Sequence, residues 1–249
     1  MNRQLLRSTT VLSALMQLTL FAGVGTVYAE DLQGTPPPPI SADLLDRHTF
    51  KVTPPELVSP GVYRIGEITV NKTEKSISFP AEINMDKGLL EYLLVRNAGK
   101  THESLFRTKI EPYNLQIASL LVDLTGTDKP LAFQGAPEIP KGDAVSITVS
   151  MTDKDGKKSE LKPEKWITKV VDGKPSDIEL LRWIFTGSIV RGGRFGAQVS
   201  GSIIALYHDP VAMVDNASAG GESDKIWFVK EGAVPPVGTP VTITIKAFK

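Results

Sequence analysis

Three stretches of the chain alternate apolar and polar residues with a period of two, and this alternation constrains the fold more than any other feature. The stretches cover residues 77–83, 145–151 and 241–247. Successive side chains of a β-strand point to opposite faces, so each stretch predicts a strand with one face turned to a core. Shorter segments rich in β-branched and aromatic residues predict further strands, at residues 183–190, 203–207 and 226–229.

Polar loops between the strand-like segments predict two hairpins. Residues 63–70 precede the first alternating stretch across a polar loop, and the second stretch is followed by a turn sequence, residues 153–156, that leads back toward Leu161. Pro80 lies inside the first stretch. Because proline cannot donate a backbone hydrogen bond, it predicts a sheet edge or a bulge at that position.

Two segments predict helices. The main one covers about residues 112–124, with Pro112 in the first turn, where a missing N–H is tolerated, and with apolar residues over most of its surface. A short helix is expected at about residues 210–216, with Asp209 as its N-cap. Together the elements predict an α+β fold: one β-rich domain with an antiparallel or mixed sheet, one main buried helix and one short helix.

The first 29 residues have the composition of a secretory signal peptide. Arg3 and Arg7 precede an apolar stretch, and small residues end it at Ala29, after which cleavage is expected. An uncleaved membrane anchor is the alternative, but polar residues interrupt the apolar run. The mature protein is therefore expected to be periplasmic or secreted, with no transmembrane segment.

Residues 30–60 contain four consecutive prolines at positions 36–39 and predict an extended arm. The arm could be a spacer that holds the domain away from a surface, or an ordinary disordered N-terminus. Residues 61–249 are assigned to the folded domain.

The absence of cysteine and the balance of charges exclude several classes of function. A chain without cysteine forms no disulfide, thiol nucleophile, iron–sulfur cluster, thiolate-bound zinc or lipoprotein anchor. Removal of residues 1–29 takes away two arginines and no acidic residue, which leaves 26 basic against 28 acidic side chains and a formal charge near −2. This balance gives no electrostatic basis for binding nucleic acid or an anionic membrane.

A dense polar segment, residues 99–105, resembles parts of catalytic motifs without completing one. Gly99-Lys100-Thr101 matches the end of a phosphate-binding loop, but Leu94 stands where the first glycine is required. His102-Glu103 begins like the helix of a zinc protease, but Phe106 replaces the second histidine. The sequence therefore supports neither a nucleotide site nor this class of protease.

One combination of residues is compatible with metal binding or general-base catalysis. His102-Glu103 and His208-Asp209 each follow a strand-like run and each precede an expected helix. If the strand ends lie side by side, His102 and His208 could bind a divalent metal, or an imidazole and a carboxylate could act together as general base and orienting group. The alternative is that the histidines bond backbone groups and the acidic residues are caps or solvated charges. Lys100 and Ser104 are candidates for ligand contact. No cofactor is predicted apart from this metal alternative.

These residues resemble the YdjY-type domain of exported bacterial proteins. The resemblance covers about residues 62–245 and is carried by four stretches, at residues 92–124, 183–188, 203–215 and 226–242. It implies one exported domain and marks His102, Glu103 and Ser104 as positions by which the family is recognised. It implies no activity, because the family is largely without an assigned one.

We therefore expect an exported, non-enzymatic domain that binds an envelope protein or a small ligand, with the loop around His102 as the contact surface. Whether the chain is an enzyme stays open. The alternative is a metal-dependent or general-base hydrolase that uses His102, Glu103, His208 and Asp209. A third possibility is a structural component tethered through residues 30–60.

Overall fold

The computed structural model describes residues 52–152 and 155–248. The predicted signal peptide and residues 30–51 of the predicted arm lie outside the described residues, as do residues 153 and 154 of the expected turn. The end of the expected arm forms a strand, β1 (Glu56–Ser59), which pairs with β2 (Val62–Ile65). Every helix in this part of the chain is too short or too polar to cross a bilayer.

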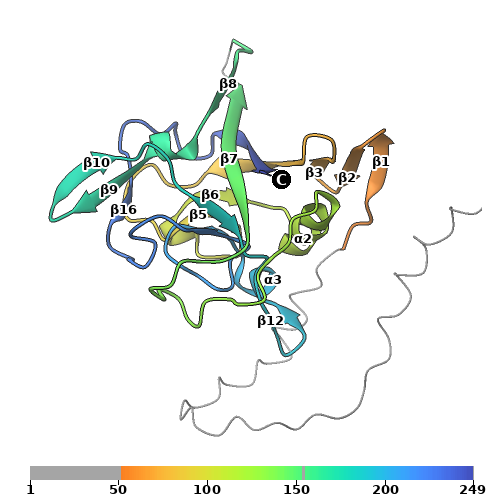
Figure 1. Ribbon diagram of the computed structural model, residues 1–249. Coiled ribbons are helices and arrows are strands. Elements are labelled where there is room, and N and C mark those ends of the chain that lie inside the picture. Colours follow the sequence, from red (N-terminus) through yellow and green to blue (C-terminus); the bar gives the residue numbers. More distant parts are fainter. Residues whose placement is uncertain (1–51, 153–154, 249) are drawn as a thin grey trace, which may run out of the picture. The chain divides into compact units, whose positions relative to one another are not determined.

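Eight strands close into a barrel (Figure 1). The barrel closes because β6 (Ser104–Thr108) pairs with both β5 (Tyr92–Arg96) and β4 (Ser76–Ile83), with Glu82 opposite Arg107 in the second pairing. Neighbouring strands are antiparallel, except for β5 with β6 and for β14 (Ser202–Ala205) with β15 (Val214–Asn216). Around the barrel the order is β4 (Ser76–Ile83), β17 (Pro240–Ala247), β7 (Asp143–Thr152), β11 (Trp183–Phe185), β15 (Val214–Asn216), β14 (Ser202–Ala205), β5 (Tyr92–Arg96) and β6 (Ser104–Thr108).

The expected α+β architecture is wrong, because the strands close on themselves and only about 11% of the described residues are helical. The expected main helix exists as α2 (Pro112–Leu121), which packs against β3 (Ile68–Asn71). It buries one side only: Ser119 is 1% exposed, whereas Leu120 is 60% exposed. The helix is therefore an accessory to the barrel and not the main layer of a core.

The expected short helix at residues 210–216 is also wrong. Asp209 does cap a turn, since its Oδ1 accepts the N–H of Val211 at 3.0 Å. The chain then enters β15 because the N–H of Met213 donates to the carbonyl of Ile203 at 3.1 Å. Pairing with β14 thus overrides the local helix signal.

Both expected hairpins are present. β3 pairs with β4, with Val70 opposite Ile77, and β7 pairs with β8 (Lys158–Leu161), with Val149 opposite Leu161. The strand expected at residues 63–70 is itself a hairpin of β2 and β3, which turns at Gly66 with a φ of 59°.

Pro80 lies where β4 changes its partner. β3 pairs with β4 as far as Ser78, and β6 pairs with β4 from Glu82 onward. Between these two points the missing N–H of Pro80 removes no bond of the ladder. Thr108 Oγ1 donates to the Pro80 carbonyl at 2.7 Å. The expected edge or bulge is therefore a change of partner inside a closed sheet.

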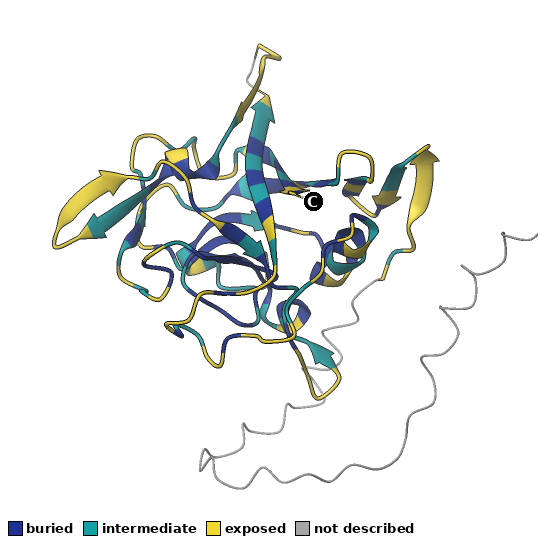
Figure 2. Cartoon of the chain, in the orientation of Figure 1, coloured by how far each residue is buried: buried dark blue, intermediate teal, exposed yellow. Residues whose placement is uncertain are grey.

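Burial follows the alternation seen in the sequence (Figure 2). On β7 the buried residues Val145, Ile147 and Val149 alternate with half-buried ones, and on β17 Ile243 and Ile245 are buried in the same way. Outside the barrel lie a small sheet of β10 (Lys174–Asp177), β9 (Ile167–Val171) and β16 (Trp227–Val229), the hairpin β12 (Val190–Arg191) and β13 (Arg194–Phe195), helix α3 (Gly196–Ser200), and the single turns η1 (Thr101–Glu103) and η2 (Pro163–Trp166).

Candidate functional site

The two segments that carry the predicted site residues, residues 99–105 and 206–209, are both bonded to Glu91, directly before β5. Its N–H donates to the carbonyl of Glu103 at 2.9 Å, and its carbonyl accepts the N–H of Tyr207 at 2.9 Å. The loop of residues 99–105 and the segment of residues 206–209 are therefore tied to the same residue.

Side chains from both segments form one polar cluster. Lys100 Nζ lies 3.5 Å from Glu91 Oε2 and 3.4 Å from Glu103 Oε1. Gln134 Nε2 donates to Glu91 Oε2 at 3.1 Å, and the Tyr92 hydroxyl donates to Asp209 Oδ2 at 2.7 Å. The polar cluster extends from the surface to the interior, and its members are Lys100, Glu103, Glu91, Gln134, Tyr92 and Asp209.

Burial and neighbouring charges raise the pKa values of two side chains of the polar cluster, Glu91 and Tyr92. Burial and the charge of Glu103 raise the pKa of Glu91, while Lys100 acts in the opposite direction. Burial and the charge of Asp209 raise the pKa of Tyr92. Glu91 therefore holds its proton to a higher pH than an exposed glutamate does, and Tyr92 remains a hydrogen-bond donor over the usual pH range.

His208 is buried between two backbone carbonyls. Its Nδ1 lies 2.7 Å from the carbonyl of Ala136, and its Nε2 lies 2.8 Å from the carbonyl of Asn216. Both ring nitrogens therefore lie within hydrogen-bond distance of a backbone carbonyl. In this arrangement neither ring nitrogen is available to a metal or to a substrate proton. His208 instead connects the segment around Ala136 to β15.

Asp215 lies beside this histidine. Its Oδ1 accepts the N–H of Asn216 at 2.7 Å and its Oδ2 accepts the N–H of Asp209 at 3.1 Å. Burial raises the pKa of Asp215 to about 7, while the charge of His208 and the two N–H donors act in the opposite direction. Asp215 is therefore a buried, titratable group in the barrel wall.

The structure brings some of the predicted site residues together and separates others. Lys100, Glu103 and Asp209 belong to the polar cluster, whereas the side chain of His102 is 77% exposed and Ser104 is buried, with its hydroxyl donating to the Phe106 carbonyl. His102 Nε2 lies 3.5 Å from Glu103 Oε2. In the described part of the chain, no three histidine or acidic side chains are grouped so that they could hold a metal ion.

Sequence reasoning missed Glu91, the residue that joins the two segments. Glu91 is the one charged residue in the apolar run of residues 89–95, and this position was a usable signal. A charge inside a buried strand needs partners, and those partners mark a site. Gln134, which comes from an irregular segment distant in sequence, carried no such signal.

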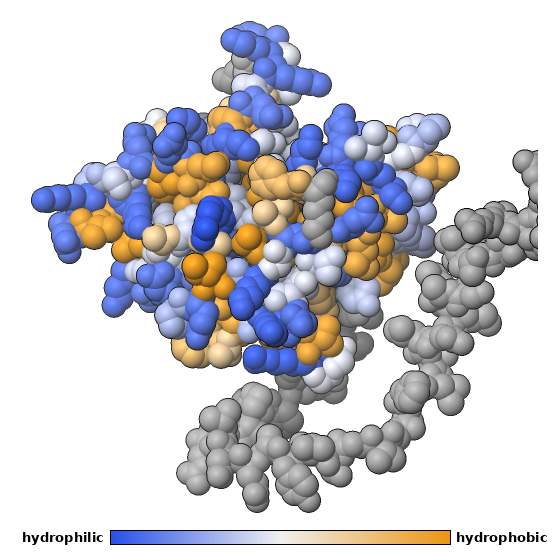
Figure 3. Space-filling model, viewed as in Figure 1, coloured by the Kyte–Doolittle hydropathy of each residue, from blue (hydrophilic) through white to orange (hydrophobic). Residues whose placement is uncertain are grey.

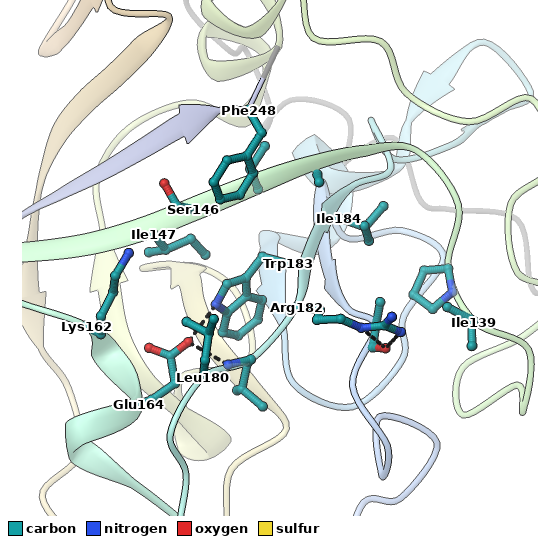
Figure 4. Close-up of a pocket in the computed structure, with 15 residues that line it drawn as sticks. Ile139, Ser146, Ile147, Lys162, Glu164, Leu180, Arg182, Trp183, Ile184 and Phe248 are labelled. Atoms are coloured by element: carbon teal, nitrogen blue, oxygen red, sulfur yellow. Dashed lines mark hydrogen bonds between the residues drawn. The ribbon is translucent and has the colours of Figure 1, made fainter.

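A second candidate site is a groove of about 460 Å³ beside β7 (Figure 4). Most of its wall is apolar, and Ile139, Leu180 and Phe248 at its border are 61%, 63% and 71% exposed. Figure 3 shows such apolar areas interrupting the hydrophilic surface on the face that carries β7. Its lining includes Ile147, Lys162, Glu164, Leu180, Leu181 and Trp183.

The groove lies where the pairing of β7 with β8 ends and its pairing with β11 begins, on either side of Ile147. Val149 is paired with Leu161 of β8, and Val145 is paired with Trp183 of β11. Continuing either register by two residues would bring Pro163 or Leu181 opposite Ile147. Proline has no N–H to donate, and η2 begins at Pro163. Ile147 therefore has no partner in β8 or β11 on this edge of β7, and it is 1% exposed.

Glu164 of η2 lies next to this position. Its Oε1 accepts two bonds of 3.1 Å, one from the N–H of Leu181 and one from Trp183 Nε1. The second carboxylate oxygen, Oε2, is buried and has no hydrogen-bond partner among the described residues. Figure 4 shows Oε2 directed away from the indole of Trp183. Buried polar atoms are nearly always bonded, so this oxygen is an unmet acceptor on the wall of an apolar groove. The sequence around Glu164 gave no sign of this burial.

Comparison with known proteins gave one match. The family model described as the YdjY domain matches residues 68–246, which confirms the resemblance inferred from the sequence. Neither the curated proteins nor the solved structures gave a match.

Proposed function

The chain belongs to the YdjY domain family, and we propose that it is an exported, non-enzymatic binding domain of the bacterial cell envelope, with the groove beside β7 as its ligand site. The observation that carries this proposal is the groove itself. Its volume of about 460 Å³ lies in the range of small-molecule sites, and such sites combine apolar walls with a few polar groups.

Export is supported by the sequence. Two arginines, an apolar stretch and small residues before Glu30 form the pattern of a signal peptide, and the chain has no cysteine to require a reducing compartment. The non-enzymatic role is supported by His208 and Asp215, whose polar atoms are bonded within the barrel. His208 bonds two carbonyls, and Asp215 accepts two N–H groups, so these residues hold the fold in place.

A blocking substitution tests the groove. Ala144 is an exposed residue of the groove, and Ala144→Trp is expected to fill part of it. Binding would be measured with N-phenyl-1-naphthylamine, a neutral apolar dye whose fluorescence rises in apolar surroundings. The wild-type chain should bind the dye, and A144W should bind it at least tenfold more weakly.

The matched control is Ala233→Trp, which places the same side chain at an exposed position outside the groove. It should bind the dye as the wild type does. Equal binding by A144W and the wild type, or no binding by any of the three chains, would contradict the proposal.

A second candidate function is a general-base hydrolase, and one observation favours it. The raised pKa of Glu91, next to Glu103 and Lys100, is the kind of shift that catalytic carboxyl groups have. His208 adds nothing to this alternative, because both of its nitrogens are bonded to carbonyls. A screen of ester and peptide substrates with the wild type and Glu91→Gln separates the two functions, since only a hydrolase would lose turnover in E91Q.

A further inference from the structure

We infer that the groove binds a short apolar peptide with free ends, whose ammonium group is held by Glu164 and whose carboxylate is held by Lys162. This inference rests on the proposed function, because it names the ligand class of the same groove. A free hydrophobic amino acid has the same two charged groups and is distinguished from the peptide by the experiment below.

The first observation is the unmet acceptor, Glu164 Oε2. The residue is 2% exposed, and its other oxygen is fixed by Leu181 and by Trp183, so the carboxylate cannot turn away without breaking two bonds. A buried carboxylate oxygen is satisfied best by a charged N–H donor. Leu180, which borders the same groove, is 63% exposed, so few contacts oppose its movement when a ligand enters.

The second observation is the charge on the same wall. Lys162 lies two residues before Glu164 and also lines the groove, but the two side chains form no ion pair with each other within 4.0 Å. Figure 4 shows the ammonium of Lys162 toward Ile147 and Ser146, away from the Glu164 carboxylate. Opposite charges that line one groove without pairing are complementary to a ligand that carries both signs.

The third observation is the unpaired position on the edge of β7 at Ile147. The N–H of Phe248 donates to the carbonyl of Ala144, so the even-numbered residues of β7 face β17 and Ile147 faces the other edge. The N–H and C=O of Ile147 are thus directed to the side that β8 and β11 have both left. A peptide can bond this pair of groups as a strand does, whereas a free amino acid has no amide to do so. This favours the peptide.

Matched ligands test the inference on the full chain by isothermal titration calorimetry. The probes are L-leucyl-L-leucine, its N-acetyl derivative without the ammonium, its amide without the carboxylate, and free L-leucine. We expect the dipeptide to bind. Acetylation should weaken binding about tenfold or more, since bonds to a buried charge are strong, and amidation should weaken it about threefold or more. Free leucine should bind more weakly than the dipeptide.

Two variants assign the contacts to their residues. Glu164→Gln keeps the shape and one carbonyl oxygen for Leu181 and Trp183, but it should weaken the dipeptide about tenfold and leave the N-acetyl derivative unchanged. Lys162→Gln should weaken the dipeptide and leave the amide unchanged. Glu160→Gln, an exposed glutamate of β8 outside the groove, is the matched control and should bind as the wild type.

The inference is overturned if the wild type does not bind the dipeptide, or if the acetylated and free dipeptides bind equally. It is also overturned if the folded E164Q variant binds the dipeptide as the wild type does. Should E164Q fail to fold by circular dichroism, the acetylated ligand on the wild type still decides the point. If the neutral dye binds the groove while the charged ends of the peptide make no difference, the inference fails and the proposed function stands. If neither the dye nor any peptide binds, both fail.

Discussion

The hydroxyl of Tyr92 donates a 2.7 Å hydrogen bond to Oδ2 of Asp209, and both side chains are buried. This bond joins the start of β5 to the capped turn before β15, which are distant in sequence. Because Asp209 also caps the turn and Gln134 donates to the same Tyr92 hydroxyl at 3.3 Å, the bond lies at the inner end of the polar cluster. It connects the candidate site residues to the stability of the barrel.

Tyr92→Phe should destabilise the protein by about 1–3 kcal/mol, because it leaves the buried Oδ2 of Asp209 without its donor. The free energy of unfolding would be measured by urea titration at neutral pH. Tyr207→Phe, a nearby tyrosine outside the polar cluster, is the control and should change the free energy by less than about 0.5 kcal/mol. A loss in Y92F no larger than that in Y207F would show that Asp209 does not depend on this bond.

The two candidate histidines should respond differently to substitution. His208→Ala leaves the carbonyls of Ala136 and Asn216 without donors and should cost roughly 2–5 kcal/mol of stability. His102→Ala removes a side chain that is 77% exposed and should change stability by less than about 0.5 kcal/mol. Thermal and urea unfolding of both variants measure this contrast. Similar losses in the two variants would contradict the structural role of His208.

Stability should fall as the pH rises from about 4 to about 7. In the folded protein burial raises the pKa of Asp215 to about 7 from 3.8, so the folded state keeps a proton that the unfolded state releases in this window. A group with a raised folded pKa stabilises the fold below the unfolded pKa, and this contribution is lost as the pH passes through the folded pKa. The slope from one such group is at most about 1.4 kcal/mol per pH unit.

Asp215→Asn tests this assignment, because it removes the titration. Urea unfolding of the wild type and D215N at pH 5 and pH 8 gives the comparison. The difference in unfolding free energy between the two pH values should shrink in D215N. Glu91, whose pKa is also raised, contributes in the same direction and should remain in the variant. An unchanged difference would rule out Asp215 as its main source.

Gly142→Ala should prevent the normal pairing of β7 with β11. A Cβ at this position would lie 2.0 Å from the carbonyl oxygen of Phe185, and its φ of 146° is unfavourable for other residues. The loss should exceed about 3 kcal/mol, because backbone has to move. Gly232→Ala has a positive φ of 77° but open space around it, and it should cost only about 1 kcal/mol. Equal losses in the two variants, measured by urea unfolding, would contradict the steric account.

The strands were predictable from the sequence, whereas their closure was not. Alternation over residues 145–151 and 241–247 located β7 and β17, because burial of one face imposes a period of two. The closing pairs, such as Glu82 with Arg107, join segments whose local sequence says nothing about each other. The helix at 112–124 was expected to be mostly buried because its surface is apolar, but a barrel already encloses its own core.

The residues of the candidate sites were likewise only partly predictable from the sequence. The segment of residues 99–105 was recognisable because it gathers charged residues at a strand end, and Lys100 and Glu103 do take part in the polar cluster. The role of Glu164 could not be predicted, because its burial depends on where β8 and β11 stop pairing with β7, on either side of Ile147. No property of the local sequence distinguishes it from the exposed glutamates.

The position of β17 has a consequence for the order of events during folding. β17 follows every other described strand in sequence, yet it lies between β4 and β7 and pairs with both, with Ile243 opposite Phe79 on one side and Val149 on the other. The barrel therefore cannot close until residues 240–247 insert between two strands that precede them by many residues. Folding thus depends on contacts of long sequence separation, which form slowly. Such a delay suits a protein that crosses a membrane as an extended chain and folds on the far side, as the proposed export requires.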